Sequence, residues 1–117
     1  MTIQQEKGLN GENTAVRFLE NKGYRILERN YRAGRYEIDI IARHKGIMVF
    51  IEVKARGSLK FGNPEDFVDD AKAERVMEGA ENYLDDVNWE GPIRFDIISI
   101  VLVGKDAEVK HFKDAFY

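Results

Sequence analysis

Residues 36–56 contain two apolar runs separated by a short polar turn, and this segment constrains the fold more than any other part of the chain. The runs are typical of buried strands, and the His-Lys-Gly triplet between them predicts a tight hairpin. With a loop of two or four residues, the residues whose numbers sum to 91 face each other. Asp39 then lies opposite Glu52, and the supporting acid Glu37 lies opposite Lys54. Because side chains alternate across a strand, all four share one face of the hairpin.

The two facing carboxylates therefore lie, with Glu37 and Lys54, at the end of a face whose remaining side chains are apolar. Directly opposed residues have Cβ atoms about 5 Å apart, so Asp39 and Glu52 can reach a single ion between them. At an effective dielectric of about 20, two carboxylates ~4 Å apart repel by about 4 kcal/mol, which raises one pKa unless a cation intervenes. Lys54 is one such cation. A divalent metal is the natural second, because Mg²⁺ favours one or two carboxylates with water and phosphate oxygens around it.

A third acid comes from the N-terminal part of the chain, where the pattern predicts a helix. Glu12, Ala15, Val16 and Leu19 have the i, i+3, i+4, i+7 spacing of one helical face, so Glu12 points the same way as the apolar stripe. Two interpretations stay open for Glu12. It is either a further acid at the metal site, or a partner for an inward-facing arginine or a backbone amide.

Periodicity along the whole chain predicts an α/β protein with the element order α-β-β-β-α-β-β. The length is typical of one globular domain, 1–117, and no repeat or linker divides it. The first predicted elements are a helix over 3–22 closed by Gly23 and strands over 24–31, 37–43 and 47–55. A second helix is predicted from Asn63 and Pro64 to Val87, with an apolar stripe that includes Ala71 and Val87. Strands over 93–103 and 108–112 follow.

Cysteine is absent from the chain, which excludes disulfide scaffolds, thiolate zinc sites and thiol nucleophiles and fits a reducing cytoplasm. The longest uncharged run, 97–104, is far shorter than the ~20 residues of a membrane span, and the N-terminus lacks the apolar stretch of a signal peptide. We therefore expect a cytoplasmic protein without a membrane segment. His44 and His111 have no ligand-spaced partners, so we expect them in turns or at the surface.

Basic and acidic residues are separated along the chain. The net charge is −3, yet residues 17–60 carry eleven basic and five acidic groups, whereas residues 61–117 carry six basic and fourteen acidic groups. Basic and aromatic side chains are interleaved at the strand ends near the predicted site. This is typical of a groove that follows a nucleic-acid backbone and stacks bases, with a solvated loop as the alternative. The candidate binding residues here are Arg32, Arg35, Tyr36 and Arg56.

The order of the acidic residues resembles a nuclease signature. Glu12 on a helix, Asp39 on a strand and Glu52-x-Lys54 on the next strand resemble the PD-(D/E)XK nuclease superfamily, in particular its archaeal Holliday-junction-resolvase branch. Over nearly the full length, the chain also resembles the YraN family of uncharacterised bacterial proteins. The segments that carry this second resemblance are GENTAVRFLENKGYRILERNYR, YEIDIIARHKGIMVFIEVKAR, FGNPED and RFDIISI.

The resemblance implies a restriction-endonuclease-like core with a central mixed sheet flanked by helices. It also implies metal-dependent hydrolysis of phosphodiester bonds in DNA, branched or damaged, with RNA as the open alternative. Asp39 and Glu52 would hold Mg²⁺ or Mn²⁺, with the Val53 carbonyl as a backbone ligand and Glu12 as an additional acid. Lys54 would orient or activate the attacking water. Because resolvase-like relatives act on two-fold junctions, the resemblance also favours a homodimer.

Two features bear on the substrate. Lys72 on the second helix resembles a basic residue that approaches the substrate phosphate in related nucleases. Tyr36 stands where the YraN pattern usually has glycine, and a tyrosine there could stack on a base or narrow the entrance. Ile38 stands at the loosely held proline position of the superfamily name.

Two other functions stay open at this point. One is a nucleic-acid-binding module of the same fold that lacks turnover, with a protein partner completing it. The other is a protein-interaction domain that uses the acidic second helix. Metal binding that depends on Asp39 and Glu52 would favour the nuclease, whereas salt-dependent DNA binding that survives Asp39→Ala would favour the binding module.

Overall fold

The computed structural model describes residues 3–56, 70–103 and 106–116. The observed element order, α-β-β-β-α-β-β, is the predicted one. Each predicted end inside the described residues agrees with the structure to within two positions, whereas the predicted helix start at Asn63 and Pro64 lies outside them. The elements are α1 (Ile3–Asn21), β1 (Arg25–Ala33), β2 (Tyr36–His44), β3 (Ile47–Arg56), α2 (Asp70–Val87), β4 (Ile93–Val103) and β5 (Asp106–Phe112).

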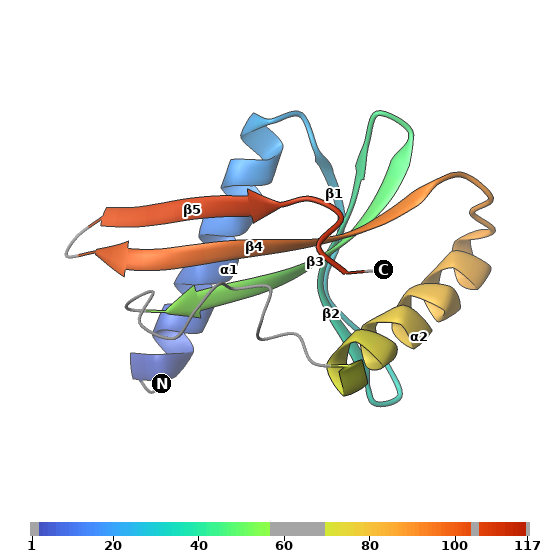
Figure 1. Ribbon diagram of the computed structural model, residues 1–117, viewed down its shortest axis with the longest axis horizontal. Coiled ribbons are helices and arrows are strands. Elements are labelled where there is room, and N and C mark those ends of the chain that lie inside the picture. Colours follow the sequence, from blue (N-terminus) through green and yellow to red (C-terminus); the bar gives the residue numbers. More distant parts are fainter. Residues whose placement is uncertain (1–2, 57–69, 104–105, 117) are drawn as a thin grey trace.

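The five strands form one mixed sheet in the order β1-β2-β3-β4-β5 (Figure 1). Only the β3–β4 pair is parallel, because α2 connects these two strands as a crossover. The two helices cover opposite faces of the sheet. Val49 and Ile51 pack with α1, whereas their neighbours Met48 and Phe50 pack with α2, as the alternation of side chains along a strand requires. Neither described helix contains a stretch long and apolar enough to cross a membrane.

The hairpin register agrees with the sequence pattern over most of its length. Five residue pairs from His44↔Ile47 to Ile40↔Ile51 have numbers that sum to 91, and the turn is Lys45-Gly46. Beyond Ile51 the ladder between β2 and β3 ends, so the expected direct pairings of Asp39 with Glu52 and of Glu37 with Lys54 are wrong. The physical reason lies in Asp39, whose carboxylate accepts the Val53 N–H at 2.8 Å and so takes a donor that the ladder would otherwise use.

The face that α2 turns towards the sheet differs from the predicted stripe. Ala71 and Val87 are exposed, and the buried positions are Ala73, Val76, Gly79, Ala80 and Tyr83. Gly79 permits a close approach, because a Cβ there would lie 3.0 Å from the Cβ of Tyr36. The helix therefore packs tightly over the start of β2, near the predicted site.

Gly11 plays the same role for α1, which passes close to the end of β3. A Cβ on Gly11 would lie only 2.7 Å from the Cβ of Ala55. We expect Gly11→Ala to lower the free energy of unfolding by about 1–2 kcal/mol, because overpacking outweighs the better helix propensity of alanine. Urea unfolding measures this loss. Adding Ala55→Gly should recover most of it, and a Gly11→Ala protein as stable as the wild type would show that the approach is not tight.

Candidate functional site

The candidate site lies where the ladder between β2 and β3 ends, beside the first turn of α2. Its most deeply buried member is Glu52 on β3, whose side chain is only 2% exposed. The ammonium of Lys72 on α2 lies 3.1 Å from Oε2 of Glu52. Asp39 on β2 is held by the Val53 amide, which donates a hydrogen bond to its carboxylate. Sheet and helix thus each contribute charged groups to one place.

The two carboxylates are close enough to repel each other. Burial and, second, the charge of Asp39 raise the pKa of Glu52 to about 7. The pKa of Asp39 is also raised, chiefly by burial, against the opposing hydrogen bond from the Val53 amide and the attraction of Lys72. The predicted pair of interacting acids is therefore present, although the ladder does not extend to it. Such a pair binds protons tightly until a cation neutralises it.

One atom of this pair lacks a partner. Within the described part of the chain, Oε1 of Glu52 is buried and accepts no hydrogen bond. A buried, unpaired carboxylate oxygen is costly, and a bound cation would remove that cost. No group of three or more histidine or acidic side chains suited to a metal occurs among the described residues. Two carboxylates still fit Mg²⁺ or Mn²⁺, because Mg²⁺ takes most of its shell from water and substrate phosphate.

Two lysines beside the acids have different tendencies to carry charge. Burial, together with repulsion by Lys72, lowers the pKa of Lys54. Burial also acts to lower the pKa of Lys72, but the attraction and hydrogen bond of Glu52 outweigh it, so that pKa is raised. Lys54 is thus the amine that gives up its proton more readily, and Lys72 remains an ammonium ion.

Glu12 makes contacts that correspond to one of its two open interpretations. Its Oε1 accepts hydrogen bonds from Arg29 Nε at 3.1 Å and from Asn30 Nδ2 at 3.0 Å, and its side chain is 13% exposed. Glu12 is therefore a partner for an arginine of β1. Its negative charge still contributes to the raised pKa of Asp39, so it lies within electrostatic reach of the site.

The predicted basic residues are distributed over three places. Arg32 pairs with Glu37 at 3.5 Å on the β1–β2 hairpin, and because both are exposed the pair adds little stability. Arg35 is exposed at the hairpin turn, beside the half-buried Tyr36. Arg56 is the last residue of β3, and its side chain lies outside the described residues.

A second buried polar cluster lies on β4 and β5, and sequence reasoning missed most of it. Asp96 is fully buried. Its carboxylate accepts hydrogen bonds from Arg94 at 2.8 Å and from the Asp114 amide at 3.0 Å. Nε2 of His111 lies 2.7 Å from Oδ2 of the same carboxylate. The side chain of His111 is only 2% exposed, so the expected surface position is wrong. A signal that could have found this contact is Arg94, which lies two residues before Asp96 and therefore on the same face of β4.

Comparisons with known proteins agree on one family. Residues 11–100 match the profile described as "Uncharacterised protein family UPF0102". A UPF0102 protein of Flavobacterium psychrophilum is 42% identical over 117 residues, covering 100% of this chain and 98% of the relative. A UPF0102 protein of Cytophaga hutchinsonii is 50% identical over 95 residues, which covers 81% of this chain and 84% of the relative. A third, of Persephonella marina, is 45% identical over 111 residues, covering 94% and 92%.

Proposed function

Because the chain belongs to the UPF0102 family and has a restriction-endonuclease-like fold, we propose that Asp39, Glu52 and Lys54 form the centre of a metal-dependent nuclease that hydrolyses DNA. The observation that carries this proposal is the buried pair of repelling carboxylates with an unpartnered Glu52 oxygen. Of the two Glu52 oxygens, the Lys72 ammonium contacts Oε2 and leaves Oε1 unpartnered among the described residues, so a further bound cation accounts for the arrangement. Branched or damaged DNA is the substrate that the resolvase resemblance favours.

In this proposal Asp39 and Glu52 hold Mg²⁺ or Mn²⁺, with the Val53 carbonyl as a backbone ligand and Glu12 as an outer acid. The metal supplies Lewis-acid polarisation of a phosphate oxygen and acidifies water bound to it. The Val53 amide keeps the Asp39 carboxylate oriented before any substrate arrives. That orientation removes a reorganisation cost from the reaction.

The two lysines divide the remaining work. Lys54, whose pKa is lowered, accepts a proton from the attacking water as its oxygen bonds to phosphorus and the bond to the leaving oxygen breaks. The leaving oxygen takes a proton from solvent. Lys72 remains an ammonium ion and attracts the non-bridging oxygens of the phosphate. The division follows from the opposite pKa shifts of the two amines.

The test is cleavage of labelled single-stranded, duplex, flapped and four-way-junction DNA with Mn²⁺ or Mg²⁺. We expect Asp39→Asn to abolish cleavage and Lys54→Met to lower its rate by about 10²- to 10⁴-fold, because general base catalysis has that size. Glu28→Gln changes an exposed carboxylate on β1 and is the matched control, which should cleave like the wild type.

Two outcomes would contradict the nuclease. If Asp39→Asn cuts DNA as fast as the wild type, the cleavage comes from a contaminant. If no substrate is cut while Asp39→Asn binds DNA with a strong salt dependence, the protein is a nucleic-acid-binding module of the same fold.

A further inference from the structure

We infer that the pocket between the β1–β2 hairpin turn and α2 binds one unpaired nucleobase next to the scissile phosphate. This inference rests on the proposed function, because it takes nucleic acid as the ligand. It adds that the preferred substrate has a single-stranded or splayed nucleotide at the site, as a flap or branch does. The pocket is lined by Arg35, Tyr36, Ala71, Glu74, Arg75 and Glu78.

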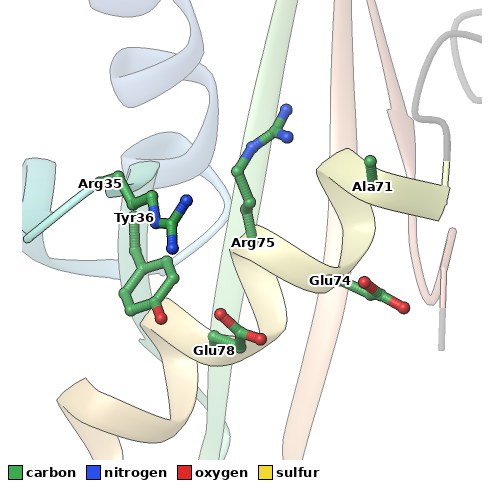
Figure 2. A pocket seen from close by; sticks show the side chains of 6 residues that line it. All are labelled: Arg35, Tyr36, Ala71, Glu74, Arg75 and Glu78. Atoms are coloured by element: carbon green, nitrogen blue, oxygen red, sulfur yellow. The ribbon is translucent and has the colours of Figure 1, made fainter.

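The pocket offers planar groups on which a base can stack. Figure 2 shows Arg35 and the Tyr36 ring on the hairpin side of the pocket, with the Tyr36 hydroxyl towards Glu78, and Arg75 extending from α2. The Tyr36 hydroxyl is hydrogen-bonded to Glu78. The Tyr36 Cβ lies close to the backbone of Gly79, since a Cβ added to Gly79 would be only 3.0 Å from it. The ring is therefore anchored at both ends. Aromatic rings and guanidinium planes are the groups on which unpaired bases stack.

The charge of the lining favours a base over a phosphate. Two arginines are offset by two glutamates, so the pocket is electrically neutral as a whole. A phosphate would require a net positive lining, whereas a neutral heterocycle does not. Among the ion pairs of the described residues, none involves Arg35 or Arg75, so both guanidinium groups can donate to base oxygen and ring nitrogen atoms. The pocket volume, about 270 Å³, is near the lower end for small-ligand sites and suits a single planar group.

The residues that line the pocket are close in sequence to residues of the proposed active site, on both α2 and β2. Ala71 and Arg75 lie at positions i−1 and i+3 relative to Lys72, which contacts Glu52. Tyr36 precedes Asp39 by three residues on β2, which spans roughly 10 Å of extended chain. That length is of the same order as the spacing between neighbouring nucleotides in a stretched single strand. A base in the pocket would thus belong to a nucleotide beside the one attacked.

The experiment measures binding without any divalent cation, so that it does not depend on turnover. The probes are a flapped DNA with 2-aminopurine in its unpaired arm and a blunt duplex of the same phosphate number. We expect the wild type to quench the 2-aminopurine and to bind the flap at least about 10-fold more tightly than the duplex, since stacking contributes ~1–3 kcal/mol per base. Tyr36→Leu should lose both the quenching and the preference, with unchanged duplex affinity. Tyr36→Phe should keep most of the quenching.

The control compares two arginines of equal charge. Arg75→Ala should weaken flap binding specifically, whereas Arg25→Ala, at the far end of the hairpin, should weaken flap and duplex binding equally and slightly. Equal affinity of the wild type and Tyr36→Leu for the flap would overturn the inference. An equal loss of affinity for flap and duplex in Tyr36→Leu would overturn it too, because that result indicates a phosphate contact only. Absence of DNA binding in the wild type would overturn it too. Loss of flap preference in Tyr36→Leu supports the base pocket even if no DNA is cleaved, so the two proposals can fail separately.

Discussion

A protein with Glu52→Gln should be more stable than the wild type at pH 8 when divalent cations are absent. The pKa of Glu52 is about 7 in the folded protein and 4.5 for an unperturbed side chain, so the folded state binds a proton more tightly than the unfolded state. The stabilisation from this proton is complete below pH 4.5 and is lost as the pH rises through about 7. Glutamine has no such titration. The expected gain at pH 8 is about 2–3 kcal/mol, from the size of the shift.

Urea unfolding in EDTA at several values between pH 5 and pH 8 measures this difference. The wild type should lose stability along the series, and Glu52→Gln should lose much less. Glu81→Gln replaces an exposed acid of α2 and serves as the matched control, which should follow the wild type. A wild-type protein that gains stability between pH 5 and pH 8 would contradict the buried-acid interpretation.

The same two proteins report on the metal. Mn²⁺ or Mg²⁺ should stabilise the wild type at pH 8, by about 2.7 kcal/mol at a concentration of 100 times the dissociation constant, because only the folded state holds the two carboxylates together. The effect should weaken at pH 6, where a proton competes for Glu52. Glu52→Gln should show little stabilisation by either ion. Equal stabilisation of both proteins would place the metal elsewhere.

The hairpin and its acids were predictable because they depend on a short-range rule. Side chains in a strand alternate with a period of two, and a two-residue turn leaves one register, so the rule places Asp39 and Glu52 on one face, directly beyond the last observed pair of Ile40 with Ile51. What the rule could not show is where the ladder ends. The Val53 N–H donates to Asp39 because this carboxylate turns towards its own sheet. The alternation of side chains along a strand does not predict the direction in which the carboxylate turns.

Contacts between elements were much less predictable. The ion pair of Lys72 with Glu52 depends on how α2 is rotated and how closely it approaches the sheet. The predicted apolar stripe was rotated enough to include Ala71 and Val87, both exposed, so the pattern did not fix the helix orientation. Gly79 was the informative residue, because its missing side chain permits the close approach. Glu12 illustrates the same limit, since its partner Arg29 comes from a strand rather than from the site.

The largest loss of stability is expected from Asp96→Ala. Asp96 is fully buried, and Arg94 donates to both of its oxygens while His111 contacts one of them. Burial alone would raise the pKa of Asp96, but the hydrogen bonds from His111 and Arg94 outweigh it, so that pKa is lowered. Removing the carboxylate leaves an arginine whose side chain is only 17% exposed without its counter-charge. Breaking a buried pair in this way costs about 3–5 kcal/mol.

Urea unfolding at pH 7 measures this loss of stability. Asp106 is an exposed acid of β5, and Asp106→Ala is the control, which should change the free energy of unfolding by less than about 0.5 kcal/mol. The difference between Asp96→Ala and the wild type should narrow as the pH falls below the ordinary aspartate value of 3.8, because a lowered pKa stabilises the fold only while the group is ionised. The Asp114 amide donates to Asp96, so it should also lose hydrogen-exchange protection. A variant that keeps both its stability and that protection would mean that backbone hydrogen bonds and apolar packing hold β5 and the C-terminal residues to β4 without Asp96.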